Sequence, residues 1–140
     1  EHPDTCLIIL GGYGDMYEKT VEKAKSLKAA SDVAIIKYLS NPYALLKRCD
    51  YFVLSSFYEG LPVVITEADL VGLPCVSTDI PGPRTFMKKY GGTLVADSEQ
   101  GVYDGMKMCL DGKLTHTLSV NYEEYNKEAV AEFERIAAMK

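Results

Sequence analysis

The residues of this sequence that are best suited to chemistry are two glutamates, Glu59 and Glu67, which are separated by seven residues. Gly60 and Pro62 lie just after the first glutamate and favour a turn that leads into a helix. An ionised carboxylate only accepts hydrogen bonds, so each glutamate suits the hydroxyl groups of a sugar or a ribose better than a phosphate. The pair therefore predicts a site for a ligand rich in hydroxyl groups, with any phosphate bound by the backbone between them.

A buried strand and a helix must hold the two glutamates in place. The apolar run at 51–54 predicts a parallel strand whose carboxyl end leads into the turn. Pro62 suits the first helical position, because the N–H that it lacks would have no intrahelical partner there. Gly72 and Pro74 predict where the helix ends.

The amino end of this helix predicts an anion site. Its first turn leaves backbone N–H groups without intrahelical partners, and together they carry about half a positive charge. We expect these groups to be those of Leu61, Val63 and Val64. Gly60 has no Cβ, so a phosphate oxygen can approach the backbone closely.

These segments together resemble the carboxyl-terminal domain of retaining GT-B glycosyltransferases of the family 4, or group 1, type, whose hallmark is E-x7-E. The matching segments read EGLP at 59–62, EA at 67–68, GLP at 72–74 and TDIPGP at 78–83. The resemblance extends from about Leu7 to the last predicted helix. It implies an α/β fold with a doubly wound, Rossmann-like parallel sheet, which is one half of a GT-B fold.

The resemblance also implies a role for each residue. Glu59 would lie beside the donor sugar as the catalytic residue, and Glu67 would bind the ribose hydroxyls of a nucleotide. The donor-binding residues would be Gly60, Leu61, Pro62, Val63 and Glu67. The substrate would be a nucleotide diphosphate sugar, transferred with retention, and no cofactor is implied. The segments at 59–62 and 78–83 resemble branches of the family that build bacterial surface polysaccharides or teichoic-acid-like polymers.

The resemblance covers only part of such an enzyme. It implies a single donor-binding domain over residues 1–140 that lacks the first strand–helix unit and the acceptor-binding domain. The full-length protein would be the enzyme, a hexosyltransferase, and this chain alone would be inactive. The missing part would bind a lipid-linked or polymeric glycan acceptor and would allow peripheral association with the inner face of the cell membrane.

The composition is that of an ordinary globular domain. The chain has 140 residues, of which 47% are hydrophobic and 25% are charged. Its formal net charge of -5 and its lack of a basic patch argue against nucleic acid as a partner. No apolar run approaches the roughly 20 residues that span a bilayer, and the first residues do not resemble a signal peptide, so we expect a cytoplasmic protein.

The cysteines and histidines predict neither a metal site nor a disulfide. Cys6, Cys49, Cys75 and Cys109 form no C-x-x-C pair, and three of them border or lie within apolar runs, so we expect buried free thiols. With only two histidines, a zinc site or a His-based triad has too few partners. The sequence has no D-x-D motif, so we predict no metal-bridged diphosphate.

Strands and helices are predicted to alternate along the chain. Apolar runs predict strands at 6–10, 33–36, 51–54, 75–76 and 93–95. Periodicity and end residues predict helices at 17–30, 39–48, 62–71, 84–90, 98–110 and 122–139. Such alternation predicts a parallel, doubly wound sheet whose ligands bind beyond the carboxyl ends of the strands, and Glu59 follows one such end.

Three other positions offer competing sites. The segment GGYG at 11–14 lacks the third glycine of a dinucleotide fingerprint, so a simple turn is the plainer interpretation, although the resemblance implies that Gly12 lies near the donor phosphates. Tyr38 follows the strand at 33–36, where the resemblance implies contact with the nucleotide base, and a solvated position explains it equally well. Arg84 fits either a phosphate-bearing acceptor or an ordinary surface position.

Three functions therefore remain open. The first is a glycosyltransferase, the second is a non-catalytic nucleotide-sugar-binding module, and the third is an NAD-dependent Rossmann enzyme. Replacement of Glu67 by alanine would abolish nucleotide-sugar binding under the first two and leave NAD binding unchanged under the third.

Overall fold

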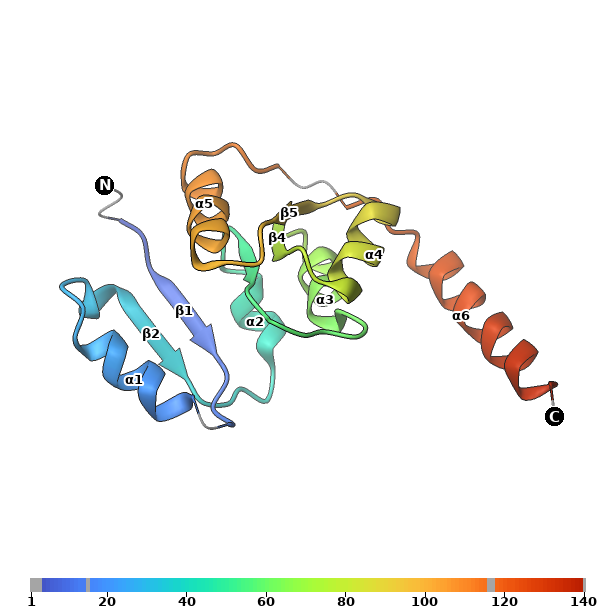
Figure 1. Cartoon of the computed structure of the whole chain (residues 1–140), viewed down its shortest axis with the longest axis horizontal. Coiled ribbons are helices and arrows are strands. Elements are labelled where there is room, and N and C mark those ends of the chain that lie inside the picture. Colours follow the sequence, from blue (N-terminus) through green and yellow to red (C-terminus); the bar gives the residue numbers. More distant parts are fainter. Residues whose placement is uncertain (1–3, 15, 116–117, 140) are drawn as a thin grey trace. The chain divides into compact units, whose positions relative to one another are not determined.

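A computed structural model describes residues 4–14, 16–115 and 118–139 (Figure 1). The chain divides into two compact units, Glu1–Leu45 (unit 1) and Leu46–Lys140 (unit 2). Among the described residues, every pair of hydrogen-bonded strands is parallel, and helices alternate with strands along the chain. The predicted α/β class is therefore confirmed.

Unit 1 is built on two parallel strands. Its elements are β1 (Leu7–Leu10), α1 (Tyr17–Lys25), the short 3-10 helix η1 (Ala30–Asp32), β2 (Val33–Ile36) and α2 (Pro42–Leu46), which ends at the border of the unit. Leu7 of β1 lies opposite Val33 of β2. α1 ends before residue 30, where the sequence predicted its end, and the Ser26 hydroxyl at its C-cap donates to the Lys23 carbonyl at 2.7 Å.

Unit 2 contains a three-stranded parallel sheet in the order β3-β4-β5. Its elements are β3 (Phe52–Leu54), α3 (Val63–Leu70), β4 (Cys75–Thr78), α4 (Pro81–Tyr90), β5 (Thr93–Val95), α5 (Glu99–Leu110) and α6 (Tyr122–Ala137). β4 is the central strand and is buried along its whole length. It continues two residues beyond the predicted strand at 75–76, and α4 begins before residue 84, where a helix was predicted.

Helices cover both faces of the sheet in unit 2. Ile65 of α3 and Phe86 of α4 pack in one apolar cluster with Cys75 of β4. Val76, the next residue of β4, packs in a second cluster with Cys109 of α5. Because neighbouring residues of a strand point to opposite faces, these clusters lie on the two sides of the sheet. The predicted doubly wound arrangement is confirmed for this unit.

The four cysteines form no disulfide and lie in different surroundings. Cys75 and Cys109 are buried, Cys49 is half-buried and Cys6 is exposed. Burial raises the pKa of the Cys75 thiol to about 12, and the nearby carboxylate of Asp69 contributes to this shift. The prediction of buried free thiols is therefore right for Cys75 and Cys109 and wrong for Cys6.

The last helix, α6, is anchored to unit 2 by its first two turns. The Tyr125 ring lies 6.2 Å from the ring of Phe86 and 6.0 Å from the ring of Tyr90, between centroids. Lys89 Nζ forms an ion pair with Glu128 Oε2 at 2.8 Å. No residue of α6 is buried, so the rest of the helix contributes little to the core.

The Tyr122 hydroxyl joins α6 to the helix that carries Glu67, with a longer contact to the Thr66 carbonyl at 3.2 Å beside its main bond. The Tyr122 hydroxyl donates to Asp69 Oδ2 on α3 at 2.5 Å. Burial raises the pKa of Tyr122, and the hydrogen bond to the Asp69 carboxylate raises it further. The neutral phenol is thus the form that the folded protein favours. Its contribution to stability is complete below pH 10.0, the ordinary pKa of tyrosine, and is lost as the pH rises through the folded-state pKa.

Replacing Tyr122 by phenylalanine should lower the free energy of unfolding by about 1–3 kcal/mol at pH 8, because it removes a donor to a charged acceptor. The variant should also lose less stability than the original chain when the pH is raised above 10. Urea unfolding at several pH values measures both effects. Tyr103→Phe is the matched control, because Tyr103 is an exposed tyrosine of α5. Equal unfolding free energies for the two variants at pH 8 would contradict the role given to this bond.

Candidate functional site

The two glutamates lie on one continuous segment that leaves the carboxyl end of β3. Residues 55–62 form the loop between β3 and α3, and α3 itself carries Glu67. Glu59 and Glu67 are both half-buried, while Gly60 between them is exposed. Six of the predicted site residues, Glu59, Gly60, Leu61, Pro62, Val63 and Glu67, are therefore brought together in unit 2.

The helix begins one residue later than predicted, after a tight turn at Pro62. The Val63 N–H donates to the Leu61 carbonyl at 2.9 Å, and Pro62 has φ -80° and ψ 69°. These values and this bond define an inverse γ-turn, which the fixed φ of proline favours. The prediction that the Val63 N–H lacks a partner is therefore wrong. The Pro62 side chain is fully buried, whereas Leu61 is 60% exposed.

Two hydroxyl groups hold the loop that carries Glu59. The Ser56 hydroxyl donates to Glu59 Oε1 at 2.9 Å. The Thr78 hydroxyl, at the end of β4, donates to the Ser56 carbonyl at 2.8 Å and is itself buried. One oxygen of the Glu59 carboxylate is thus oriented by the protein, and the loop is fixed to the central strand.

The backbone at Gly60 is open to a ligand. A Cβ placed on Gly60 would meet no atom of unit 2 within 4 Å apart from its chain neighbours, so the side of Gly60 on which a side chain would project is open within this unit. Glu67 lies four residues after Val63, at about 6 Å along the helix axis. The segment therefore carries a carboxylate, a glycine that is open on one side and a second carboxylate in succession.

The Arg84 side chain is hydrogen-bonded to Asp79 in the same unit. Its Nε donates to Asp79 Oδ1 at 2.6 Å, and its second guanidinium nitrogen donates to the Asp79 carbonyl at 2.7 Å. Both side chains are more than 40% exposed, at 44% and 42%. The structure therefore favours the plainer of the two predictions for Arg84, a surface position at the start of α4.

The two remaining predicted site residues, Gly12 and Tyr38, lie in unit 1. Gly12 is buried, and a Cβ added to it would lie 2.0 Å from Lys37 Cγ, so close packing against Lys37 accounts for the glycine. Tyr38 follows Lys37 directly and is 68% exposed. The two residues are therefore brought together at the carboxyl ends of β1 and β2.

Three residues beside the site were not predicted. Ser56 and Thr78 hold the loop by hydrogen bonds, and Gly82 touches its backbone. Ser56 and Thr78 lie at the carboxyl ends of neighbouring parallel strands, so a search for polar residues at every strand end could have found them. The sequence holds no comparable sign for Gly82.

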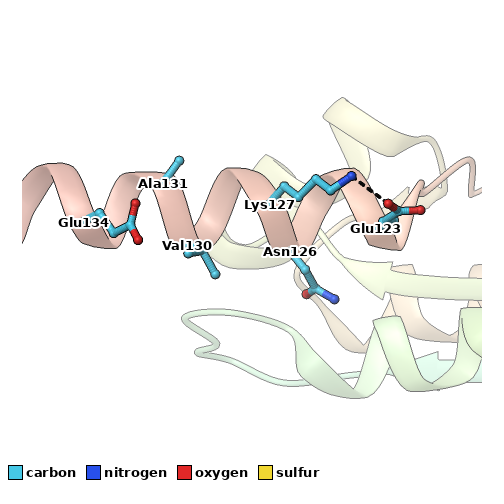
Figure 2. A pocket seen from close by; sticks show the side chains of 6 residues that line it. All are labelled: Glu123, Asn126, Lys127, Val130, Ala131 and Glu134. Carbon is cyan, nitrogen blue, oxygen red and sulfur yellow. Dashed lines mark hydrogen bonds and ion pairs between the residues drawn. The ribbon is translucent and has the colours of Figure 1, made fainter.

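Other parts of the described surface are weaker candidates for a ligand site. A hollow along α6 is lined only by residues of that one helix, which Figure 2 shows side by side: Glu123, Asn126, Lys127, Val130, Ala131 and Glu134. One helix face cannot enclose a ligand. Among the described residues, no three acidic, cysteine or histidine side chains gather as metal ligands, and no helix is both long and apolar enough to cross a membrane.

Comparison with known proteins gives a consistent result. A family model described as glycosyl transferases group 1 matches residues 1–128. The uncharacterized glycosyltransferase MJ1059 of Methanocaldococcus jannaschii is 38% identical over 88 residues, which are 62% of this chain and 21% of that protein. The UDP-Gal:alpha-D-GlcNAc-diphosphoundecaprenol alpha-1,3-galactosyltransferase of Escherichia coli is 26% identical over 121 residues, which are 85% of this chain and 31% of that protein. The chain thus spans about a fifth to a third of the length of these relatives.

A solved structure extends the likeness to three dimensions. The lipopolysaccharide outer core galactosyltransferase WaaB, in its apo form, superposes with a TM-score of 0.67 at 22% identity. The superposition covers 93% of this chain and 42% of that one. At this level of identity the likeness concerns the fold alone, and the predicted Rossmann-like half of a GT-B fold is confirmed.

Proposed function

The chain belongs to the glycosyl transferases group 1 family, and on this basis we propose that it is the donor-binding half of a retaining glycosyltransferase. The whole protein would transfer a sugar from a nucleotide diphosphate sugar to an acceptor. This half binds the donor, and another part of the whole protein binds the acceptor. Without that part, this half does not catalyse transfer.

The observation that carries this proposal is the way the loop after β3 holds Glu59. The Ser56 hydroxyl orients one carboxylate oxygen at 2.9 Å, and Gly60 is open on the side where a Cβ would project. A sugar placed against Glu59 would have its diphosphate against the backbone that follows. Glu67, further along α3, would then receive the ribose hydroxyls, which suit an acceptor-only carboxylate.

Donor binding in this proposal requires no metal ion. The diphosphate charge is balanced by backbone dipoles at the start of α3 and by groups outside this chain. The donor-binding residues proposed in unit 2 are Gly60, Leu61, Pro62, Val63 and Glu67. Pro62 acts through its turn, since its side chain is fully buried.

The acceptor is proposed to be a lipid-linked or polymeric glycan of the bacterial cell surface. The name of the Escherichia coli relative states that it acts on a diphosphoundecaprenol-linked sugar. An acceptor of that kind would bring the whole protein to the inner face of the cell membrane as a peripheral, cytoplasmic protein. The alternative function is a nucleotide-sugar-binding module without transfer activity.

The experiment that tests the proposal is a thermal-shift comparison of UDP, GDP, CDP, ADP, their sugar derivatives and NAD, in the presence of EDTA. A ligand at a hundredfold excess over its dissociation constant adds about 2.7 kcal/mol to the stability of the folded state. We expect one nucleoside diphosphate and its sugar derivative to stabilise the protein, and NAD to have no effect.

The comparison is made on this chain and on the longest natural form of the protein. A shift with the same nucleotide in either form supports the proposal. The absence of a shift in both forms, or a shift with NAD alone, would overturn it. Renewed sugar transfer by the longer form would separate the enzyme from the binding module.

A further inference from the structure

The backbone that carries Glu59 rests directly on the first turn of α4. Gly82 is the second residue of that helix, and a Cβ placed on it would lie 1.9 Å from the Gly60 carbonyl oxygen and 2.4 Å from the Glu59 carbonyl oxygen. Both distances are far shorter than a van der Waals contact. Both oxygens belong to the backbone, which cannot rotate away as a side chain can. Only glycine therefore allows this approach.

The support that Gly82 provides is itself rigid. Pro81 and Pro83 flank it in the first turn of α4, and the ring of each fixes its own φ. The Pro83 side chain is fully buried in unit 2. The fixed φ angles and the buried Pro83 side chain resist a shift of this turn, so we expect an atom added at position 82 to displace the loop.

A second anchor holds the same loop from the central strand. The buried Thr78 hydroxyl donates to the Ser56 carbonyl, and the Ser56 hydroxyl donates to Glu59. The loop is thus fixed on the Thr78 side by a hydrogen bond and on the Gly82 side by direct contact. The two anchors lie on either side of the turn between β4 and α4.

We propose that Gly82, with Thr78 as its second anchor, is a positioning residue that sets where the Glu59 carboxylate meets the donor sugar. This inference rests on the proposed function. Gly82 does not touch the ligand in this account. It acts by fixing the peptide between Glu59 and Gly60, and therefore the direction in which the carboxylate leaves the backbone.

The test compares Gly82→Ala with Gly101→Ala, which imposes the same kind of clash at a distant place. Gly101 lies in the first turn of α5, and a Cβ on it would lie 2.1 Å from the Ala96 carbonyl oxygen. Both variants thus force a methyl group against a backbone carbonyl at a helix start. The loss of stability that any such clash causes is common to both and is removed by the comparison.

The decisive measurement is the ratio of the affinities for the nucleotide sugar and for the matching nucleoside diphosphate, in the longest natural form of the protein. Displacing Glu59 should remove the gain in affinity that the sugar brings, while Glu67 continues to bind the ribose. We expect Gly82→Ala to lower this ratio at least about tenfold, a free-energy change of about 1.4 kcal/mol. Gly101→Ala should leave the ratio unchanged. An equal ratio in both variants would overturn the inference.

A second measurement does not depend on the ligand. Hydrogen exchange at residues 56–60 should accelerate in Gly82→Ala and remain unchanged in Gly101→Ala, and equal exchange in the two variants overturns the inference. If Gly82→Ala does not fold, Thr78→Val removes the other anchor without adding a clash and must lower the same affinity ratio. If the original protein binds no nucleotide, the proposed function fails, and the exchange data still show whether the loop is held by Gly82.

Discussion

Replacing Glu59 by glutamine should lower the rate of sugar transfer by at least about 100-fold in the longest natural form of the protein. The change keeps the size of the side chain and its contact with the Ser56 hydroxyl, but it removes the negative charge that would face the donor sugar. Stabilisation of charge that develops in the transition state contributes mainly to kcat. The nucleoside diphosphate carries no sugar for Glu59 to contact, so the affinity for it should change by less than about threefold.

The measurement is a steady-state transfer assay with the donor that the nucleotide comparison identifies. Glu99→Gln is the matched control, because Glu99 is an exposed glutamate in the first turn of α5 and should leave the rate unchanged. If Glu59→Gln keeps a third or more of the original kcat, the catalytic role assigned to this carboxylate is wrong. A loss of nucleotide affinity equal to the loss of rate would make Glu59 a binding residue instead.

The second large effect is expected for Glu67→Ala, which should weaken binding of the nucleoside diphosphate by at least about 100-fold. Two hydrogen bonds from ribose hydroxyls to a carboxylate contribute about 1.5–3 kcal/mol each, and alanine can form neither. The nucleotide sugar should lose affinity by the same factor, because both ligands carry the ribose. In this respect Glu67→Ala differs from Gly82→Ala, which should affect only the sugar derivative.

Isothermal titration of the nucleoside diphosphate, its sugar derivative and NAD measures these affinities. Glu134→Ala on the exposed last helix is the control for a lost surface charge. If Glu67→Ala binds the nucleotide as the original chain does, the carboxylate is structural, and the assignment of the ribose site is wrong.

The sequence predicted the strands better than the ends of the helices. The strands at 33–36 and 93–95 were predicted at their observed bounds, because a short apolar run between turns has few other interpretations. β4 was predicted too short, because Ser77 and Thr78 are polar residues that the strand buries. The Ser77 hydroxyl donates to the carbonyl of its neighbour Thr78, whereas the Thr78 hydroxyl donates to the Ser56 carbonyl, a bond that depends on tertiary structure.

The start of α4 was missed for a related reason. The segment at 81–83 reads PGP and was interpreted as a loop, yet a proline at the first helical position loses no hydrogen bond. The same segment contains Gly82, whose contact with Gly60 joins residues far apart in the chain. Local propensity carries no information about such a contact. The glutamates themselves could be predicted because their spacing and the turn between them lie within one continuous segment.

The contrast between the exposed Cys6 and the buried Cys75 and Cys109 gives this protein an internal chemical reporter. Alkylating reagents consume thiolates, and the raised pKa of Cys75 keeps that sulfur protonated at neutral pH even when the reagent reaches it. A maleimide dye added to the native protein would thus mark unit 1 first. Cys75 and Cys109 would take up label only as the sheet of unit 2 opens. The mass gained after the labels on Cys6 and the half-buried Cys49 would therefore record the opening of this core without any mutation.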